Sequence, residues 1–146
     1  MAKIVMAHGA GGKTSAELMS KVFGKYFANE VLDKMEDGAV LRMNGKVAYS
    51  TDSFVVTPLK FKGGDIGKLC ICGTVNDLLM MGAEPKYIAC GFILEEGLDI
   101  ELLEEVVASM AVQAKKEVMD SISDVVEGTI ENDIILDVNG RLMRIL

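Results

Sequence analysis

The order of strand-like and helix-like segments constrains the fold of this chain more than any other feature. Asn44-Gly45 and Asn139-Gly140 each lie between short apolar runs, and Asn-Gly is the strongest short signal for a β-hairpin. Elsewhere, apolar residues recur at helical spacing. Strands are predicted at 3–7, 39–43, 46–51, 86–94, 134–138 and 141–146, and helices at 15–27, 66–81 and 99–119. Hairpins mixed with helices predict an α+β fold, with a mostly antiparallel sheet and helices on one face.

Length and composition predict a single domain over residues 1–146. Its pattern is weaker over 121–128, and its C-terminal tail from about residue 117 is atypical. The chain has 146 residues and is 50% hydrophobic, so it is long enough to form a core. No apolar run reaches the roughly 18 residues needed to cross a membrane, and residues 1–8 are too short for a signal peptide. These features predict a cytoplasmic protein that does not enter a membrane.

Charge and cysteine content exclude several classes of partner and site. The net charge is −7, which disfavours binding to the phosphate backbone of nucleic acid. Three cysteines, Cys70, Cys72 and Cys90, lie in apolar surroundings, and their odd number is typical of reduced thiols in the cytosol. The single histidine, His8, excludes a zinc site built from several histidines.

Acidic residues in short frames of small residues are the candidate functional groups. Asp37 precedes Gly38, Asp52 follows the predicted strand 46–51, and Asp77 lies in Gly-Thr-Val-Asn-Asp-Leu. Any one of them alone is better explained as a cap or turn residue. If the three carboxylates converge, they repel one another unless a cation lies between them. Mg²⁺ prefers oxygen ligands and commonly accompanies nucleotide phosphates, so it is the expected cation.

Two glycine-marked loops precede predicted helices. The first runs from His8 to Thr14 and fits a relaxed P-loop pattern, in which amides surround phosphates and Lys13 supplies a positive charge. A glycine-rich nucleotide loop of another family and a plain flexible turn are the alternatives, because such patterns arise often. In the second loop Asp65 follows two glycines. It is either a helix-stabilising carboxylate or part of a phosphate site that uses Lys68.

Read together, these frames resemble one known family. They are Ala7 to Lys13, Glu36 to Val40, Thr51 to Val56, Gly63 to Gly67, Cys72 to Leu78, Met80 to Ala83 and Gly91 to Gly97. From about Ile4 to about Ala114 the chain is similar to the N-terminal part of the HypE family of hydrogenase maturation factors. That family lies within the aminoimidazole ribonucleotide synthetase (PurM)-like ATP-binding superfamily.

The resemblance implies a fold, a set of ligands and partners. It implies a domain that forms a homodimer through its sheets and binds ATP with Mg²⁺. By position, the metal ligands are Asp37, Asp52 and Asp77; the nucleotide groove is lined by Asp65, Lys68 and Asn76; and the loop that closes over it holds His8, Gly11, Gly12 and Lys13. The family is an ATP-dependent carbamoyl dehydratase that makes the cyanide ligand of nickel–iron hydrogenase, receives carbamoyl from HypF and serves the HypC–HypD complex.

Two departures from the family limit what this chain is expected to do. After its long helix the family continues with a strand that carries Thr-Gly-Asp-Thr-Lys, and nothing similar follows Lys116 here. The family then has a second domain and a terminal cysteine, whereas no cysteine follows Cys90. We therefore expect an incomplete form that does not complete the reaction alone. A P-loop NTPase and a non-catalytic dimerisation module are the alternative functions.

Overall fold

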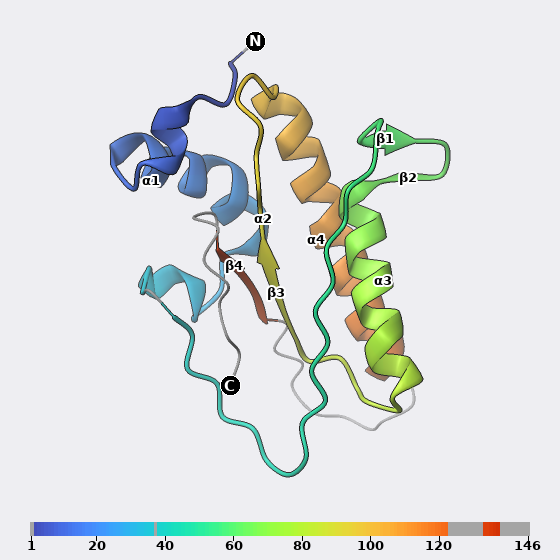
Figure 1. The fold of residues 1–146 in the computed structure, drawn as a ribbon. Helices are drawn as coiled ribbons and strands as arrows, with labels where there is room; N and C mark the ends of the chain where they lie inside the picture. The colour runs from blue at the N-terminus through green and yellow to red at the C-terminus, as the bar shows by residue number, and fades with distance from the viewer. Residues whose placement is uncertain (1, 37, 123–132, 138–146) are drawn as a thin grey trace. The chain divides into compact units, whose positions relative to one another are not determined.

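A computed structural model describes residues 2–36, 38–122 and 133–137 (Figure 1). The chain divides into two units. The first consists of residues 1–41, 87–107 and 133–146, and the second of residues 42–86 and 108–132. Each unit combines helices with a short strand pair. This composition confirms the predicted α+β class.

The N-terminal part of the first unit is helical. The predicted helix over 15–27 is confirmed as one run with a π-helical turn in its middle. Its parts are α1 (Lys13–Leu18), η2 (Met19–Phe23) and α2 (Gly24–Phe27), preceded by the 3₁₀ turn η1 (Met6–Gly9) and followed by η3 (Leu32–Lys34). The helical period directs the apolar side chains inward, and Leu18, Val22, Phe23 and Phe27 are buried.

The strand expected at 3–7 is wrong in most of its length. Lys3 forms only an isolated bridge with Asp99, and Ile4 exchanges backbone hydrogen bonds of 2.8 Å with Leu98 and Gly97. The chain then turns into η1, because the amide of Val5 donates to Nδ1 of His8 at 2.9 Å. A local side-chain acceptor thus satisfies a backbone donor that a strand would have paired with its neighbour.

The strand pair of the first unit is parallel. β3 (Tyr87–Gly91) pairs with β4 (Asp133–Asp137) in a register from Tyr87↔Asp133 to Gly91↔Asp137. β3 lies within the predicted strand 86–94, and β4 begins one residue before the predicted strand 134–138. The turn at Asn139-Gly140 and the return strand 141–146 lie outside the described residues. The phenyl rings of Phe23 and Phe92 meet edge to face at 5.0 Å and tie the helical run to the chain just after β3.

The long helix α4 (Ile100–Ile122) confirms the helix predicted over 99–119. In the first unit its face buries Leu103, Val106 and Val107. Glu104 of this part accepts hydrogen bonds from Lys25 and from the Tyr26 hydroxyl, the latter at 3.0 Å. The ion pair lowers the pKa of Glu104 and raises that of Lys25, chiefly through this hydrogen bond.

The second unit is built on α3 (Ile66–Met80), as predicted. A two-residue strand pair, β1 (Lys60–Phe61) with β2 (Gly64–Asp65), runs antiparallel and leads directly into the helix. Gly82 takes φ +69°, the left-handed conformation that ends helices and that favours glycine. Buried side chains of α3 and of the later part of α4 form the core; they are Ile71, Val75, Leu78, Met110, Ala111 and Ala114.

The hairpin predicted around Asn44-Gly45 is also wrong. Gly45 keeps a left-handed φ of +81°, but residues 39–43 and 46–51 form no strands. Within the described ranges, no backbone group from 39 to 56 is hydrogen-bonded to another backbone group. A two-stranded hairpin is marginal without a third strand or a packed face, and Val47 and Tyr49 are exposed here. No described helix is long and apolar enough to cross a membrane.

Candidate functional site

The second unit contains most of the predicted site residues, and Asp77 is the best connected of them. It lies near the C-terminal end of α3 with its side chain exposed. The hydroxyl of Ser50 donates to Oδ2 of Asp77 at 3.1 Å. This bond attaches the extended segment after Gly45 to the helix. Among the described residues, no lysine, arginine or histidine forms an ion pair with Asp77, so its charge has no cationic partner there.

Asp52 lies on the same extended segment, two residues after Ser50. Its carboxylate is exposed and accepts from the amide of Ser53 at 2.7 Å. Two residues further on, the ring of Phe54 lies against α3 at Gly73. Gly73 and Asp77 are four residues apart in the helix and therefore share a face. Asp52 is thus carried by a segment that contacts this face of α3 on either side of it.

The residues at the start of α3 have local structural roles. Oδ1 of Asp65 accepts from the amide of Lys68 at 2.9 Å, which makes Asp65 the N-cap of the helix. The ammonium of Lys68 donates to the carbonyl of Gly63 at 3.3 Å. Asn76 is exposed on α3 next to Asp77. The cap interpretation of Asp65 is therefore seen directly, and Lys68 is exposed.

The glycine loop lies in the first unit and is held by a buried serine. Ser15 accepts from the amide of Gly11 at 3.0 Å and donates to the carbonyl of Ala7 at 3.4 Å. Gly11 takes φ +74°, which favours glycine at this turn. Nδ1 of His8 is occupied by the Val5 amide. The same nitrogen also lies 3.2 Å from the Val5 carbonyl oxygen, so its role as donor or acceptor is set by the tautomer of the ring.

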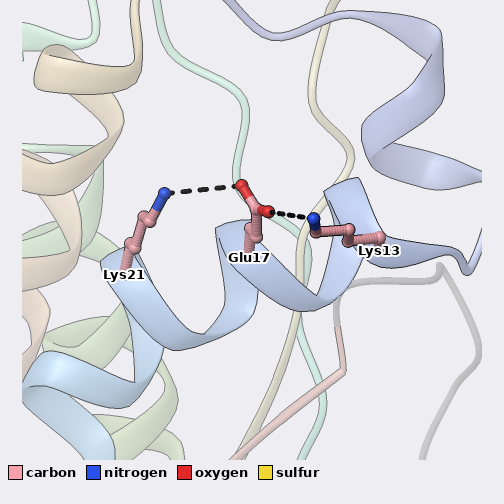
Figure 2. Close-up of polar contacts among 3 residues, drawn as sticks. All are labelled: Lys13, Glu17 and Lys21. Atoms are coloured by element: carbon pink, nitrogen blue, oxygen red, sulfur yellow. Dashed lines mark hydrogen bonds and ion pairs between the residues drawn. The ribbon is translucent and has the colours of Figure 1, made fainter.

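Lys13 begins α1 and is aligned along the helix surface (Figure 2). Its ammonium lies 3.9 Å from Oε1 of Glu17, and Lys21 lies 3.4 Å from Oε2 of the same carboxylate. The side chain of Lys13 is 90% exposed. Exposed pairs of this kind contribute little stability, so Lys13 is free to turn toward an anion.

The structure describes two of the three carboxylates of the predicted triad. Asp37 lies outside the described residues, and Asp52 and Asp77 both belong to the second unit. Among the residues that are described, no three histidine, cysteine, aspartate or glutamate side chains form a group that could hold a metal ion. Mg²⁺ commonly uses only one or two carboxylates and completes its shell with water and phosphate, so two exposed aspartates on one unit fit its chemistry.

Cysteine chemistry is separate from these residues. All three cysteines are half-buried and form no disulfide with one another. The Cys72 thiol lies 3.7 Å from Oε1 of Glu117 on α4, and Glu117 also accepts from buried Gln113. Burial, followed by the charge of Glu117, raises the pKa of Cys72. The thiol therefore stays protonated at neutral pH, which argues against a nucleophilic or metal-binding role.

Sequence reasoning missed three residues that hold the candidate groups in place. Ser50 binds Asp77, Gly73 receives the ring of Phe54, and Ser15 anchors the glycine loop. Ser50 and Gly73 lie in the same short frames as Asp52 and Asp77. The closeness of Ser50 and Gly73 to these aspartates in the sequence was the available signal. Which side chains meet is decided by how the segment packs on α3.

Comparison with known proteins places most of the chain in one family. Residues 35–139 match the model of the AIR synthase related protein, N-terminal domain. The carbamoyl dehydratase HypE of Escherichia coli is 49% identical over 121 residues, which cover 79% of this chain and 36% of that protein. A putative hydrogenase expression/formation protein of Methanocaldococcus jannaschii is 34% identical over 144 residues, covering 87% and 43%.

Solved structures agree with the sequence relatives. A crystal structure of the hydrogenase maturation protein HypE in complex with ATP has a TM-score of 0.75 and 43% identity, and the alignment covers 93% of this chain and 38% of that one. A structure of HypE from E. coli has a TM-score of 0.66 and 41% identity, covering 86% and 38%. The chain therefore spans somewhat more than a third of the length of these proteins.

Proposed function

We infer that this chain binds ATP together with Mg²⁺. It belongs to the AIR synthase related family, whose N-terminal domain it matches over residues 35–139. A structural relative at 43% identity is a complex with ATP, and its fold matches this chain at a TM-score of 0.75. The observation that carries the proposal is the pair of exposed carboxylates, Asp52 and Asp77, on one unit without a cationic partner among the described residues.

The residues present suit a magnesium–nucleotide complex. Asp52 and Asp77 offer hard oxygen ligands, and Asp37 is proposed as the third. Bound Mg²⁺ neutralises part of the charge of the phosphates. Lys68 and Lys13 are the exposed cations proposed to bind phosphate oxygens, with Asp65 and Asn76 in the groove for the nucleotide. The proposed closing loop contains His8, Gly11 and Gly12.

In the larger context we propose that this domain is the nucleotide-binding part of a carbamoyl dehydratase of hydrogenase maturation. The E. coli protein with that name is 49% identical to this chain, and the chain covers 36% of it. The proposal includes the dehydration by the larger protein, receipt of carbamoyl from HypF and service to the HypC–HypD complex. It also includes a cytoplasmic location. The single domain over 1–146 with an atypical tail from about 117 remains our interpretation.

A P-loop NTPase is less well supported by the geometry. In that motif a strand leads into the loop and several loop amides face the phosphates. Here the described residues before the loop form no strand: Lys3 makes an isolated bridge and Ile4 two backbone hydrogen bonds. The Gly11 amide already donates to Ser15. A methyl group at Gly9 would meet no atom within 4 Å, so Gly9→Ala leaves the fold intact and serves as a clean test.

Calorimetric titration of the chain with ATP in the presence of Mg²⁺ tests the proposal. Asp52→Asn and Asp77→Asn should each weaken binding on the order of tenfold to a hundredfold, because each removes a charged ligand. Glu84→Gln is the matched control: this exposed carboxylate of the same unit pairs only with Lys86, at 3.9 Å, among the described residues, and its loss should change nothing.

Two results would contradict the proposal in different ways. Loss of binding in Gly9→Ala with full binding in Asp52→Asn would favour the P-loop alternative. Absence of any heat or thermal shift with the unmodified chain would favour a dimerisation module that binds no nucleotide.

A further inference from the structure

We propose that Gly73 is a positioning residue for the candidate cation site. Because it has no side chain, the ring of Phe54 can lie directly against α3, and this contact fixes the segment that carries Asp52 over the helix face that carries Asp77. The inference rests on the proposed role of these two carboxylates in binding Mg²⁺ and ATP. It adds a residue that touches neither ligand and acts through Phe54.

The contact leaves no room for even one methyl group. A Cβ atom built at Gly73 would lie 2.7 Å from Cζ and 2.8 Å from Cε1 of Phe54. Both distances are well below van der Waals contact between carbon atoms, which is near 3.5–4.0 Å. The ring is the far end of a half-buried side chain, and in this proposal it cannot move away from the clash without shifting the segment that carries it.

Two attachments fix this segment, and Asp52 lies midway between them. Ser50 binds Asp77 at one end, and Phe54 meets Gly73 at the other, so the segment runs antiparallel to α3. Four extended residues span up to roughly 13 Å, whereas four helical residues rise only about 6 Å. The extended segment between its two attachments can therefore span a greater distance than the stretch of α3 between Gly73 and Asp77. The position of Asp52 depends on both attachments being kept.

The effect of Gly73→Ala on stability has an unusual predicted sign. Alanine normally stabilises a helix relative to glycine, because glycine has more conformational freedom to lose. Gly24→Ala in α2 should follow that rule and raise Tm, since its Cβ would come no closer than 3.4 Å to the Met19 carbonyl. Gly73→Ala should instead lower Tm, because the displaced Phe54 ring loses packing.

The same variant should also lose affinity for the cation. We expect Gly73→Ala to weaken binding of Mn²⁺ and of the Mn²⁺–ATP complex on the order of tenfold or more, measured by electron paramagnetic resonance well below Tm. Mn²⁺ is the probe because it replaces Mg²⁺ on oxygen ligands and is directly observable. Gly24→Ala should bind like the unmodified chain. A residue that acted on stability alone would not change the affinity of the folded protein.

A double-variant cycle separates positioning from a general disturbance of α3. Phe54→Ala removes the ring and should itself weaken Mn²⁺ binding, because one attachment of the segment is lost. In that background the methyl group added by Gly73→Ala no longer clashes with a ring. Phe54→Ala/Gly73→Ala should therefore bind no more weakly than Phe54→Ala and have a higher Tm.

The outcomes distinguish failure of the inference from failure of the proposed function. If Gly73→Ala raises Tm as Gly24→Ala does, or lowers Tm but keeps full Mn²⁺ affinity, positioning by Gly73 is wrong while nucleotide binding stands. If the two losses simply add in the double variant, the action through Phe54 is wrong. If the unmodified chain binds neither Mn²⁺ nor Mn²⁺–ATP, the proposed function falls and this inference falls with it.

Discussion

At Cys72, burial and a neighbouring carboxylate act in the same direction on one thiol. Both favour the neutral form, and Glu117 is the group that can be changed without altering the shape of the site. Glu117→Gln should lower the pKa of Cys72 toward its ordinary value. The thiolate fraction rises as the pKa falls, so alkylation of Cys72 at a fixed mildly alkaline pH should accelerate by roughly twofold or more.

Mass spectrometry of iodoacetamide-treated protein across a pH series measures this rate at each cysteine. The profile for Cys72 should move to lower pH in Glu117→Gln and stay in place in Glu84→Gln, which does not touch the thiol. An unmoved profile in Glu117→Gln would show that the carboxylate does not act on this sulfur in solution.

Single residues also show how far the sequence determines the candidate site. The frames around Asp52 and Asp77 identify them as candidates, and the structure places both on one unit. The sequence does not reveal that Ser50 reaches Asp77 or that Phe54 reaches Gly73, because these pairs are 27 and roughly 19 residues apart and meet only when the segment docks on α3. Local patterns report on local structure, and such contacts are tertiary.

For α3, one cap residue has both an observed structural role and a proposed binding role. Asp65→Ala removes the acceptor for the Lys68 amide and should destabilise the fold by about 1 kcal/mol. Asp65→Asn keeps an acceptor and should cost far less. Chemical denaturation followed by circular dichroism measures both values. Equal losses in the two variants would show that the charge, rather than the cap hydrogen bond, stabilises the helix.

The same pair of variants tests the binding role of Asp65. If its carboxylate lines the nucleotide groove, Asp65→Asn should weaken ATP binding while leaving stability nearly unchanged. Unchanged affinity in this variant would restrict Asp65 to the cap.

Helices were easier to predict than strands in this chain for a physical reason. The helices over 15–27, 66–81 and 99–119 satisfy their backbone hydrogen bonds internally, so a periodic apolar face suffices to locate them. The strands predicted at 39–43 and 46–51 need a partner, and among the described residues none pairs with them. The short apolar runs that suggested these strands are present, but burial of their side chains depends on something beyond the segment itself.

At the scale of the whole molecule, that unpaired segment supports the proposed homodimer. Val47, Tyr49 and Val55 lie at alternate positions and are 53%, 55% and 94% exposed. Among the described residues, no backbone group of residues 39–56 bonds to another backbone group, and extended backbone of this kind with an apolar face is suited to pairing with a second copy. We expect a dimer by size-exclusion chromatography with light scattering, and a monomer when Val47→Lys and Tyr49→Lys are combined.

Val112→Lys is the matched control for the oligomeric state. Val112 is 70% exposed on α4, outside the segment, and its replacement should leave the dimer intact. A monomeric unmodified chain, or dissociation by Val112→Lys alone, would contradict pairing through residues 42–56.

The parallel pairing of β3 with β4 sets the order of events during synthesis. Tyr87 meets Asp133, roughly 46 residues later in the chain. At translation speeds of about 5–20 residues per second, β3 leaves the ribosome roughly 2–9 seconds before its neighbour exists. The first unit therefore cannot complete its strand pair until β4 has been synthesised. During that interval a nascent edge strand is open to wrong partners, which makes the delay a point at which chaperones or a slower ribosome would change the yield of folded protein.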